Sequence, residues 1–557
     1  MSEVDQFLTR GQPVFEDAAL QRVARSDGVE AAWRVLFASA NVDAALSRVS
    51  GDFAMAFVDS DGRGVAMVDR FATRSLCWRV RDGRLAVAER ADELADETTA
   101  IDLQAIYDYL YFHCIPSPRT IYQGIYRLPA AHSLRFDGRA VRVWRYWVPH
   151  FAPQRQADFK SLKAEFFRTL KDAVARQLDG SKPACFLSGG TDSSSVAGLI
   201  QAVTGQGADG YSIGFEAEGY DEMEYARLAA RRFGARHHEY YVTPQDIADS
   251  IHKVAAHYDQ PFGNSSALPS YYCARMAAAD GVTRLLAGDG GDELFGGNAR
   301  YAKQRVFGWY RKVPSALRGT VLEPLLGTAL ARRMSLLRKG GSYVEQARVP
   351  MPTRQNMYNL LLRVGAAEVL SPALLAAVDH SLPTQHQQHT WDEVRGASEL
   401  NTTLAFDWRY TLAESDLPKV VGMTGLAGVQ VGFPLLDGQL LDFSLRLPDA
   451  YKLRGLKLRW FFKEALRGFL PDEIIAKSKH GFGLPFGVWV HKHAALHQIA
   501  RDTLHSLEER GVLRPGFAAK LWKELLPQHP GYYGEMVWIL SMLELWFQAR
   551  KPAFRLV

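Results

Sequence analysis

The stretch Phe186-Leu-Ser-Gly-Gly-Thr-Asp-Ser-Ser194 has the residue types of a loop that binds an anion. It follows apolar residues that predict a buried strand, and a predicted helix begins directly after it. Gly189 and Gly190 let backbone amides turn inward, and Ser188 and Ser193 add hydroxyl donors. The helix start adds the positive end of its dipole. A Ser/Gly-rich turn with a capping aspartate is the simpler alternative.

Asp192 lies within this loop, where its carboxylate would repel a phosphate. A Mg²⁺ ion that bridges Asp192 to the phosphates resolves the conflict. No Gly-Lys-Ser/Thr follows, so the loop is not the type that grips a γ-phosphate for phosphoryl transfer. The pattern favours a pyrophosphate leaving group instead. Such chemistry means attack on the α-phosphorus of ATP, which gives an acyl-adenylate.

A second glycine-rich stretch, Leu286-Ala-Gly-Asp-Gly-Gly-Asp-Glu-Leu-Phe-Gly-Gly297, also follows a predicted buried strand. It carries Asp289 and Asp292. Asp292 is the natural second ligand for Mg²⁺ opposite Asp192, because magnesium on a pyrophosphate needs hard oxygen ligands. A calcium loop or a plain turn would explain this stretch alone. Two such loops at one end of a sheet favour the magnesium site.

The third stretch, Lys477-Ser-Lys-His-Gly-Phe-Gly-Leu-Pro-Phe486, offers a cation. We expect Lys479 to stabilise the negative charge that builds on oxygens as carboxylate attacks phosphorus and amine attacks acyl carbon. A surface lysine beside Lys477 is the alternative, and residue chemistry alone leaves the two open.

The elements around these stretches predict an α/β fold. Strands that alternate with helices indicate a doubly wound parallel sheet, in which loops at the carboxyl ends of the strands bind ligands. A long helix is predicted at 158–178, and the chain from about 300 onward is mostly helical, with a basic loop at 332–341 and a polar stretch at 370–395. The predicted strands are 184–187, 210–215, 237–242 and 283–287.

Residues 1–150 form a separate unit in this prediction. Short apolar runs separated by Asp-Gly pairs, such as Asp61-Gly62 and Asp82-Gly83, indicate a β-rich meander or sandwich. A linker at 149–156 joins it to the second domain, which we place at 158–557.

Several ordered motifs resemble the asparagine synthetase family over residues 160 to 550. Besides the two glycine-rich loops and the Lys479 segment, the matching motifs are Ser212–Phe215, Tyr220–Glu222 with Tyr225 and Ala226, Asp259–Phe262, Ser266–Pro269 and Phe433–Asp437. The resemblance implies an ATP pyrophosphatase domain of the adenine nucleotide α-hydrolase type. It also implies an amino-terminal domain of the αββα type found in N-terminal-nucleophile (Ntn) hydrolases.

The resemblance also implies roles, with ATP and Mg²⁺ as cofactors. Asp192 and Asp292 would hold Mg²⁺, and Lys479 would be catalytic. Asp259 and Asp289 are further candidates for binding the substrate. The pyrophosphate loop would comprise Ser188, Gly189, Gly190, Asp192 and Ser193, and the contacts to AMP would come from Leu187, Ile213 and Gly288.

Two departures from the family pattern bear on the substrate. The family carries Glu-x-Arg before Pro-Phe-Leu-Asp, whereas Gln430 and Gly432 stand here, which puts the usual small amino acid in doubt. The family's front domain uses Cys as its second residue to attack glutamine, whereas Ser2 stands here. The Gly-Asp-Phe motif begins at residue 51, which is earlier in the chain than in the family. The family's segments that hold glutamine have no counterpart in this sequence. We therefore expect a truncated, glutaminase-inactive scaffold or docking domain.

Composition restricts the classes of function. With 47% hydrophobic and 23% charged residues and a net charge of +5, the chain resembles a globular protein without a dedicated nucleic-acid partner. Four distant cysteines with no Cys-x-x-Cys pair fit a reducing cytoplasm. We find neither a signal peptide nor a run long enough to span a membrane, and we expect a cytoplasmic enzyme.

The favoured function is that of a lasso-peptide macrolactam synthetase, which adenylates a side-chain carboxylate and closes it on the peptide's own amine. A tethered amine has a high effective concentration, so no ammonia supply is needed. The partners would be a peptide or amino acid with a carboxylate and an amine, and a precursor-processing protein. A β-lactam synthetase, an ammonia-dependent asparagine synthetase and a non-catalytic AMP- or peptide-binding regulator are the alternatives.

Overall fold

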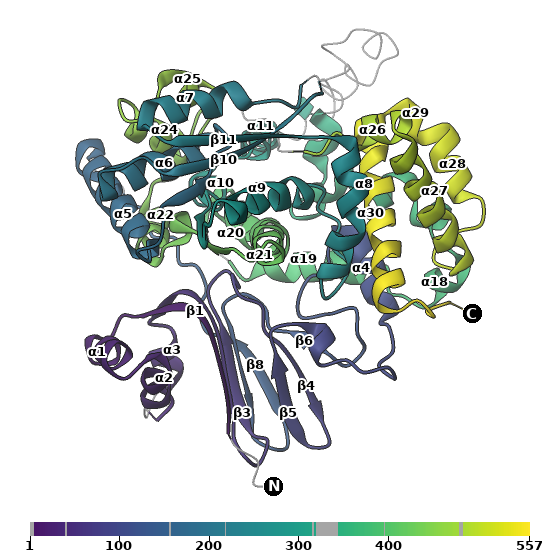
Figure 1. Cartoon of the computed structure of the whole chain (residues 1–557), viewed down its shortest axis with the longest axis horizontal. Coiled ribbons are helices and arrows are strands. Elements are labelled where there is room, and N and C mark those ends of the chain that lie inside the picture. The colour runs from purple at the N-terminus through teal and green to yellow at the C-terminus, as the bar shows by residue number, and fades with distance from the viewer. Residues whose placement is uncertain are drawn as a thin grey trace.

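The computed structural model describes residues 5–38, 42–154, 158–217, 219–314, 317–318, 343–394, 396–477 and 483–556. Two parts are stacked on each other, a β-rich amino-terminal domain and a larger α/β domain (Figure 1). No helix in these ranges is both long and apolar enough to cross a bilayer.

The amino-terminal domain contains two antiparallel sheets. The larger has the order β1 (Gln6–Phe15), β2 (Val49–Val58), β3 (Gly64–Val68), β7 (His132–Phe136), β8 (Val141–Arg145), and the smaller has the order β5 (Arg84–Ala88), β4 (Cys77–Arg81), β6 (Tyr126–Arg127).

Alternation along β2 explains how these layers pack, because successive side chains of a strand point to opposite faces. Phe53 and Met55 share a core with Trp33 of α2 (Val29–Phe37). Ala54 and Ala56 share another core with residues of the smaller sheet. The helices α1 (Ala18–Ser26), α2 and α3 (Val42–Leu46) therefore cover one face and the second sheet covers the other, as the predicted Ntn-hydrolase-like domain requires.

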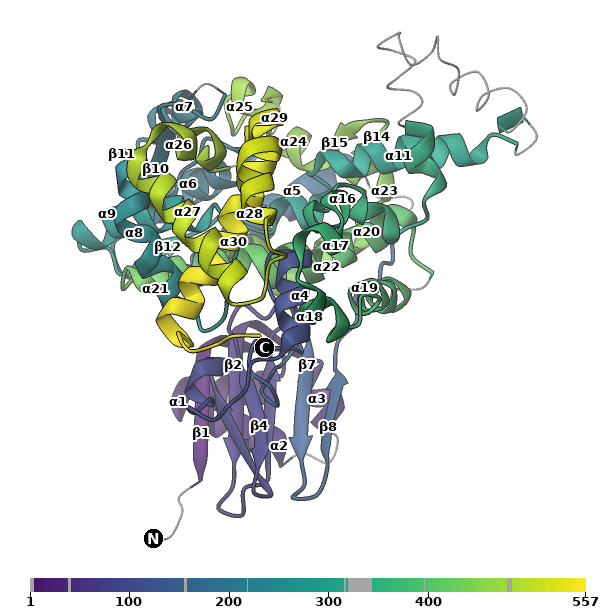
Figure 2. The ribbon, with the colours of Figure 1, turned by 90° about the vertical axis from the view of Figure 1, so that its right-hand side faces the viewer.

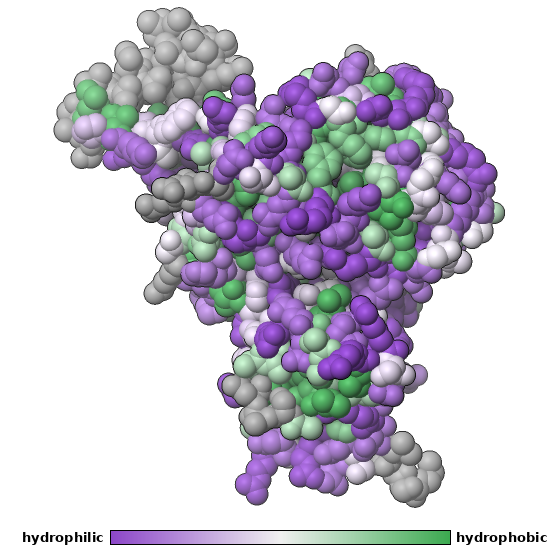
Figure 3. Space-filling view, turned by 90° about the vertical axis from the view of Figure 1, so that its left-hand side faces the viewer, coloured by the Kyte–Doolittle hydropathy of each residue, from purple (hydrophilic) through white to green (hydrophobic). Residues whose placement is uncertain are grey.

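Figure 3 shows the side of the molecule that carries α1, α2 and α3. The amino-terminal domain presents a hydrophobic area on this face, and Val35 of α2 is 51% exposed.

The larger domain is built on the predicted parallel sheet. Its strand order is β11 (Arg236–Val242), β10 (Asp209–Phe215), β9 (Ala184–Phe186), β12 (Arg284–Leu286), β13 (Gln430–Gly432). The chain begins at β9, moves outward to β11 and then returns to β12 on the other side of β9. The order thus reverses between β9 and β12, and ligands bind outside the strand ends at such a reversal. The prediction of a doubly wound sheet is confirmed.

Helices cover both faces of this sheet (Figure 1). Cys185 points into the core that includes residues of α5 (Phe159–Gln177), α6 (Thr191–Thr204) and α7 (Met223–Phe233). Its neighbour Ala184 points into the opposite core, with Cys273 and Ala277 of α9 (Ala267–Ala279). Helix α8 (Pro244–His257) lies beside α9.

The rest of the described chain is largely helical, including the stretch 370–394, whereas the predicted basic loop at 332–341 lies outside the described residues. The remaining elements are η1 (Ala91–Glu93), α4 (Leu103–Phe112), α10 (Gly291–Phe295), α11 (Ala299–Lys312), η3 (Thr353–Tyr358), α16 (Leu360–Val364), α17 (Ala366–Val369), α18 (Pro372–Ala376), α19 (Leu382–Asp392), α20 (Glu399–Asp407), the π-helix η4 (Trp408–Asp416), α21 (Leu417–Leu426), η5 (Pro434–Leu436), α22 (Gly438–Arg446), α23 (Asp449–Lys452), β14 (Leu453–Arg454), β15 (Lys457–Leu458), α24 (Trp460–Leu466), α25 (Asp472–Ala476), α26 (Phe486–Lys492), α27 (Ala494–Glu509), α28 (Phe517–Lys520), the π-helix η6 (Leu521–Leu525), α29 (Leu526–Gln528) and α30 (Pro530–Arg550).

Helix α4 joins the two domains. It leaves the amino-terminal sheets and lies beside α30, as Figure 2 shows. Ile106 and Tyr109 share one core with Trp538 and Ile539, and the Tyr109 hydroxyl donates to the Ile539 carbonyl at 2.8 Å. The amino-terminal domain is therefore packed into the core of the larger domain.

Candidate active site

The first predicted loop connects β9 to α6 and folds as an anion site requires. Gly190 caps α6 without a side-chain hydrogen bond, so backbone amides of the first turn remain available. The Ser188 amide donates to the Ser193 hydroxyl at 3.1 Å, and the two hydroxyls lie 3.0 Å apart. Gly189 has φ +71°, and a Cβ there would lie 2.4 Å from the Ala226 nitrogen of α7. Only glycine fits this position.

The second loop, after β12, lies directly against the first. A Cβ on Gly288 would come within 2.8 Å of the Ser193 nitrogen, and one on Gly291 within 2.0 Å of Asp192 Oδ1. The glycines therefore allow the two loops to touch. This contact lies at the reversal of strand order, because β9 and β12 are the strands on its two sides.

The two aspartates predicted to share a metal converge on one side chain, Arg459. Its Nη1 donates to Asp192 Oδ2 at 2.6 Å and to Asp292 Oδ1 at 2.8 Å, and its Nη2 also contacts Asp192. Asp292 is buried, whereas the Asp192 side chain is 21% exposed. The structure thus brings Asp192 and Asp292 together from separate loops.

Sequence reasoning missed Arg459, which lies between two short elements without a recognisable motif. It has φ +52°, an uncommon conformation for a residue with a side chain. Its amide donates to the Gly296 carbonyl at 3.2 Å, and its guanidinium lies 4.0 Å from the centre of the Phe462 ring. These contacts and the two aspartates hold it in place.

An acidic cluster lies beside the two loops, formed by the buried Glu293 and the partly buried Asp289 and Asp416, with Lys419 as its cation. Lys419 donates to Asp416 at 3.0 Å, and it interacts electrostatically with Asp289 and Glu293. Asp289 also interacts electrostatically with Asp192. Only Asp289 of this cluster was singled out from the sequence. Glu293 belongs to the same glycine-rich motif, which was the signal available for finding it.

Burial raises the pKa of two carboxyls in this cluster, Asp289 and Glu293. It raises the pKa of Asp289 to about 6, with further upward contributions from Asp416 and Asp192 and a downward one from Lys419. It also raises the pKa of Glu293 to about 8, again with help from Asp416. At neutral pH, Glu293 therefore carries its proton and Asp289 is mostly ionised. Carboxyls with perturbed pKa values at the strand ends of such a sheet are typical of functional sites.

Two of the three residues predicted to contact AMP, Leu187 and Ile213, lie at neighbouring strands of the sheet, and the third, Gly288, lies in the loop after β12. Leu187 extends β9 and its amide donates to the Tyr211 carbonyl at 2.9 Å, whereas Ile213 is half-buried on the adjacent strand β10. Their contact with AMP stays a prediction. Lys479 lies outside the described residues. Lys477, two positions earlier, is ion-paired with Glu222 at 2.9 Å.

Asp259 lies elsewhere, at the domain interface. Its carboxylate accepts the Ala91 amide of the amino-terminal domain at 2.8 Å, and its predicted contact with substrate stays untested. The departure at Gly432 has a steric reason, because a Cβ there would lie 2.4 Å from the Gln177 amide oxygen and 3.0 Å from Arg284. These two side chains are hydrogen-bonded at 2.7 Å.

The donor set at Asp192 and Asp292 suits Mg²⁺. Two carboxylates already face a single cationic group, and phosphate oxygens and water usually supply the remaining ligands of this ion. In the ranges that the structure describes, no cluster of three or more histidine, cysteine or acidic side chains forms a self-sufficient metal site.

Comparison with known proteins agrees with this geometry. The family model Asparagine synthase matches residues 165–548, and the model Glutamine amidotransferase domain matches residues 34–147. A Mycobacterium bovis protein, provisionally named a glutamine-hydrolyzing asparagine synthetase, is 27% identical over 476 residues, which cover 80% of this chain and 68% of the relative.

Two further relatives have different names. Asparagine synthetase (glutamine-hydrolyzing) 1 of Bacillus subtilis is 24% identical, with 76% of this chain and 66% of the relative covered. Amidase chry2 of Gibberella zeae is 23% identical, and the match covers 80% of this chain and 71% of the relative. The Asparagine synthase match spans well over half of the chain and includes both glycine-rich loops, so this protein belongs to the asparagine synthase family of ATP-dependent amide-forming enzymes.

Proposed function

We propose that this enzyme converts a carboxylate and ATP into an acyl-adenylate and pyrophosphate, and then passes the acyl group to an amine with release of AMP. The carrying observation is that Asp192 and Asp292 converge on one cation beside a loop with free helix-start amides. Mg²⁺ held by these two carboxylates would neutralise the departing pyrophosphate.

The bonds change in two steps. A carboxylate oxygen attacks the α-phosphorus, and the bond from that phosphorus to the bridging oxygen breaks, which releases pyrophosphate. The amine nitrogen then attacks the acyl carbon, the bond to the AMP oxygen breaks, and the amine loses a proton. We assign Lys479 to the charge that develops on the oxygens in both steps.

The acidic cluster suits the amine. Buried carboxylates attract an ammonium group, and Asp289, with a pKa of about 6, is mostly ionised at neutral pH and able to accept a proton. We therefore assign Asp289 to amine binding. This assignment extends the earlier expectation that Asp289 contacts substrate.

We propose a peptide as the substrate, closed on its own amine as a macrolactam. Gln430 and Gly432 stand where the family pattern carries Glu and Arg. The loss of these two charged residues supports a substrate other than a small amino acid. A separate protein that processes the precursor peptide would then be a partner. The second candidate is formation of asparagine, because the bacterial relatives are named glutamine-hydrolyzing asparagine synthetases. With an inactive front domain, ammonia would have to replace glutamine as the amine source. Closure of a small amino acid to a β-lactam is a third possibility for the same chemistry.

The test is incubation of the enzyme with ATP, Mg²⁺ and a panel of peptides that carry an amino-terminal amine and an internal Asp or Glu. Mass spectrometry should find a product that has lost one water and resists aminopeptidase, because its amine is now in a ring. The matched control is the Asp292→Asn variant, which should form none.

The alternatives give other results in the same assay. Asparagine formed from aspartate and ammonium, with no change to any peptide, would replace the macrolactam proposal by the second candidate. If wild-type enzyme exchanges labelled pyrophosphate into ATP with no carboxylate of either class, the enzymatic proposal is wrong and a binding protein remains.

A further inference from the structure

The π-helix η4 (Trp408–Asp416) connects the domain interface to the acidic cluster. Wide helical turns of this kind are rare and occur frequently at functional sites. Glu414, near the end of η4, is 3% exposed and contacts the amino-terminal domain. Asp416, two residues later, belongs to the acidic cluster beside Asp289. One short segment therefore contacts both places.

The contacts of Glu414 come mainly from the other domain. Its Oε1 accepts the Ser117 amide at 3.2 Å and the Ser117 hydroxyl at 2.7 Å. Arg127 of the amino-terminal domain and Arg409 of η4 both pair with the same carboxylate. Arg409 also donates to the Ser117 hydroxyl at 2.9 Å. A buried carboxylate with this many charged and polar partners is fixed in position.

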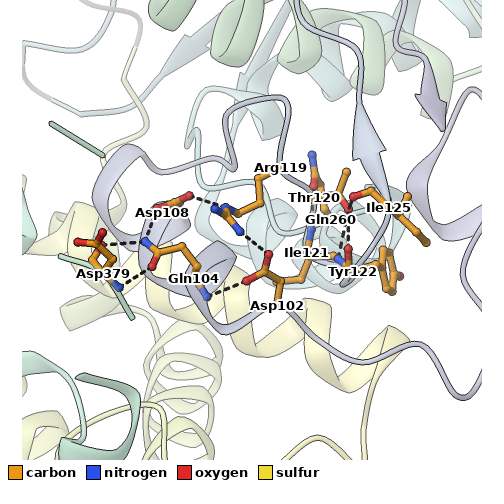
Figure 4. A network of polar contacts seen from close by, with 10 residues as sticks. All are labelled: Asp102, Gln104, Asp108, Arg119, Thr120, Ile121, Tyr122, Ile125, Gln260 and Asp379. Carbon is orange, nitrogen blue, oxygen red and sulfur yellow. Dashed lines mark hydrogen bonds and ion pairs between the residues drawn. The ribbon is translucent and has the colours of Figure 1, made fainter. Parts of the chain in front are cut away.

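Ser117, one of the two amino-terminal residues that bind Glu414, begins a loop held by several hydrogen bonds and ion pairs, whereas Arg127 belongs to β6. Figure 4 shows Arg119 between Asp102 and Asp108, and the Gln260 side chain accepting the Ile121 amide. In the same network Gln104 bonds to Asp379 of the larger domain. The loop from Ser117 to Ile121 is thus attached at several points and can serve as a rigid support.

The carboxyl-terminal end of the segment carries Asp416, a member of the acidic cluster. Asp416 accepts from Lys419 at 3.0 Å, and Lys419 interacts electrostatically with Asp289 and Glu293. Between them, Ser415 accepts from the Asn264 amide at 3.0 Å. Only Ser415 separates Glu414 from Asp416 in the chain, and Lys419 is hydrogen-bonded to Asp416. A shift of Glu414 would therefore displace Asp416 and Lys419.

We propose that Glu414 is a positioning residue: the amidotransferase-like domain, through Ser117 and Arg127, holds η4 so that Asp416 and Lys419 are placed against Asp289. The domain thereby serves the amine step as a structural support. This inference rests on the proposed function, because it assigns the acidic cluster to the amine. It gives the amino-terminal domain a role that does not require glutamine.

The first test needs no substrate. Hydrogen–deuterium exchange is compared for wild type, Glu414→Gln and Glu393→Gln. Glu393 pairs with Arg145 across the same domain interface, but it lies at the end of α19 and outside η4, so it is the matched control. Glu414→Gln should speed exchange in residues 411–420 by at least about tenfold. Peptides from the two glycine-rich loops, and all peptides of Glu393→Gln, should match wild type.

The second test separates adenylation from amine attack. Glu414→Gln should slow amide formation by at least about 30-fold while changing ATP–pyrophosphate exchange by less than about threefold, because the pyrophosphate loop lies outside the segment. A general structural defect would lower both rates together. Ser117→Ala, which removes the hydrogen bond from the Ser117 hydroxyl, should change the ratio of amide formation to ATP–pyrophosphate exchange in the same direction but by less. This variant replaces Glu414→Gln if Glu414→Gln does not fold.

Each of these measurements can overturn the inference about Glu414. Unchanged exchange at 411–420, or an equal change in Glu393→Gln, would overturn the inference, as would equal losses in both rates. If wild type exchanges no pyrophosphate with any carboxylate, the proposed function fails instead, and the deuterium result still decides whether Glu414 holds Asp416 in place.

Discussion

At the residue scale, charge determines what the site can bind. Asp192 and Asp292 contribute two negative charges and Arg459 one positive charge, so the trio keeps a net attraction for a cation. The Arg459 guanidinium is also a bidentate partner for phosphate oxygens. We therefore expect these three side chains to exchange partners when a nucleotide binds with Mg²⁺.

Lys479 is the residue on which turnover should depend most. The Lys479→Ala variant should lose product formation by about 100-fold or more, because a fixed cation stabilises charge that appears only in the transition states. ATP binding, measured by calorimetry, should remain nearly unchanged. An unaltered turnover number would remove Lys479 from the mechanism. Lys477→Ala distinguishes the two lysines, because Lys477 is already paired with Glu222.

Glu293 should make stability depend on pH. Its pKa rises from an ordinary 4.5 to about 8 through burial, so the folded protein keeps a proton that the unfolded chain releases between those values. The free energy of unfolding should therefore fall as pH rises from 6 to 8, by an amount on the order of 2 kcal/mol. Urea denaturation of wild type and Glu293→Gln at both pH values measures this difference.

The variant should flatten that dependence, since glutamine does not titrate. Glu473→Gln, at an exposed position, is the control and should follow wild type. Parallel curves for wild type and Glu293→Gln would contradict a proton held by Glu293 in the folded protein.

At the scale of elements, the two glycine-rich loops depend on the absence of side chains. Gly288→Ala would place a Cβ 2.8 Å from the Ser193 nitrogen and 3.0 Å from the Asp192 carbonyl carbon. We expect ATP–pyrophosphate exchange to fall by about 100-fold, because small misplacements of positioning groups have effects of that size. Gly425→Ala in α21 meets nothing within 4 Å and should leave exchange unchanged. Equal rates in both variants would mean that the loops do not need close contact.

Sequence could predict these loops because their chemistry is local. Gly-Gly-Thr-Asp-Ser follows directly on a short apolar strand, and the strand–helix alternation alone placed both loops at one sheet edge. Arg459 and Lys419 could not be found this way, since one lies between β15 and α24 and the other in α21, both more than 100 residues after the loops. Only tertiary packing brings them to Asp192 and Asp289. Asp259 had a recognisable motif, but its carboxylate binds the Ala91 amide of the other domain.

At the scale of the whole molecule, the amino-terminal domain is joined to the larger domain by many polar contacts. Arg74 donates to the Val431 carbonyl of the sheet edge at 3.3 Å and pairs with Asp52 within its own domain. Arg90 donates to the His257 carbonyl at 2.9 Å. These contacts suit a permanent structural support more than a separately acting glutaminase.

Glutamine should accordingly give no glutamate, with or without ATP. Ser2, which lies outside the described residues, would have to act as the nucleophile, and the sequence lacks the segments that hold glutamine in the family. An enzymatic glutamate assay at high protein concentration measures this. Glutamate release that disappears in Ser2→Ala would overturn the scaffold interpretation.

The most direct test of the whole account is where ATP is cut. The substrate carboxylate is labelled with oxygen-18, and the nucleotide products are analysed by mass spectrometry. If the carboxylate attacks the α-phosphorus at the Asp192–Asp292 site, one labelled oxygen must appear in AMP, and unlabelled pyrophosphate must be released in equal amount. Formation of ADP and orthophosphate, with label in the phosphate, would contradict the central claim.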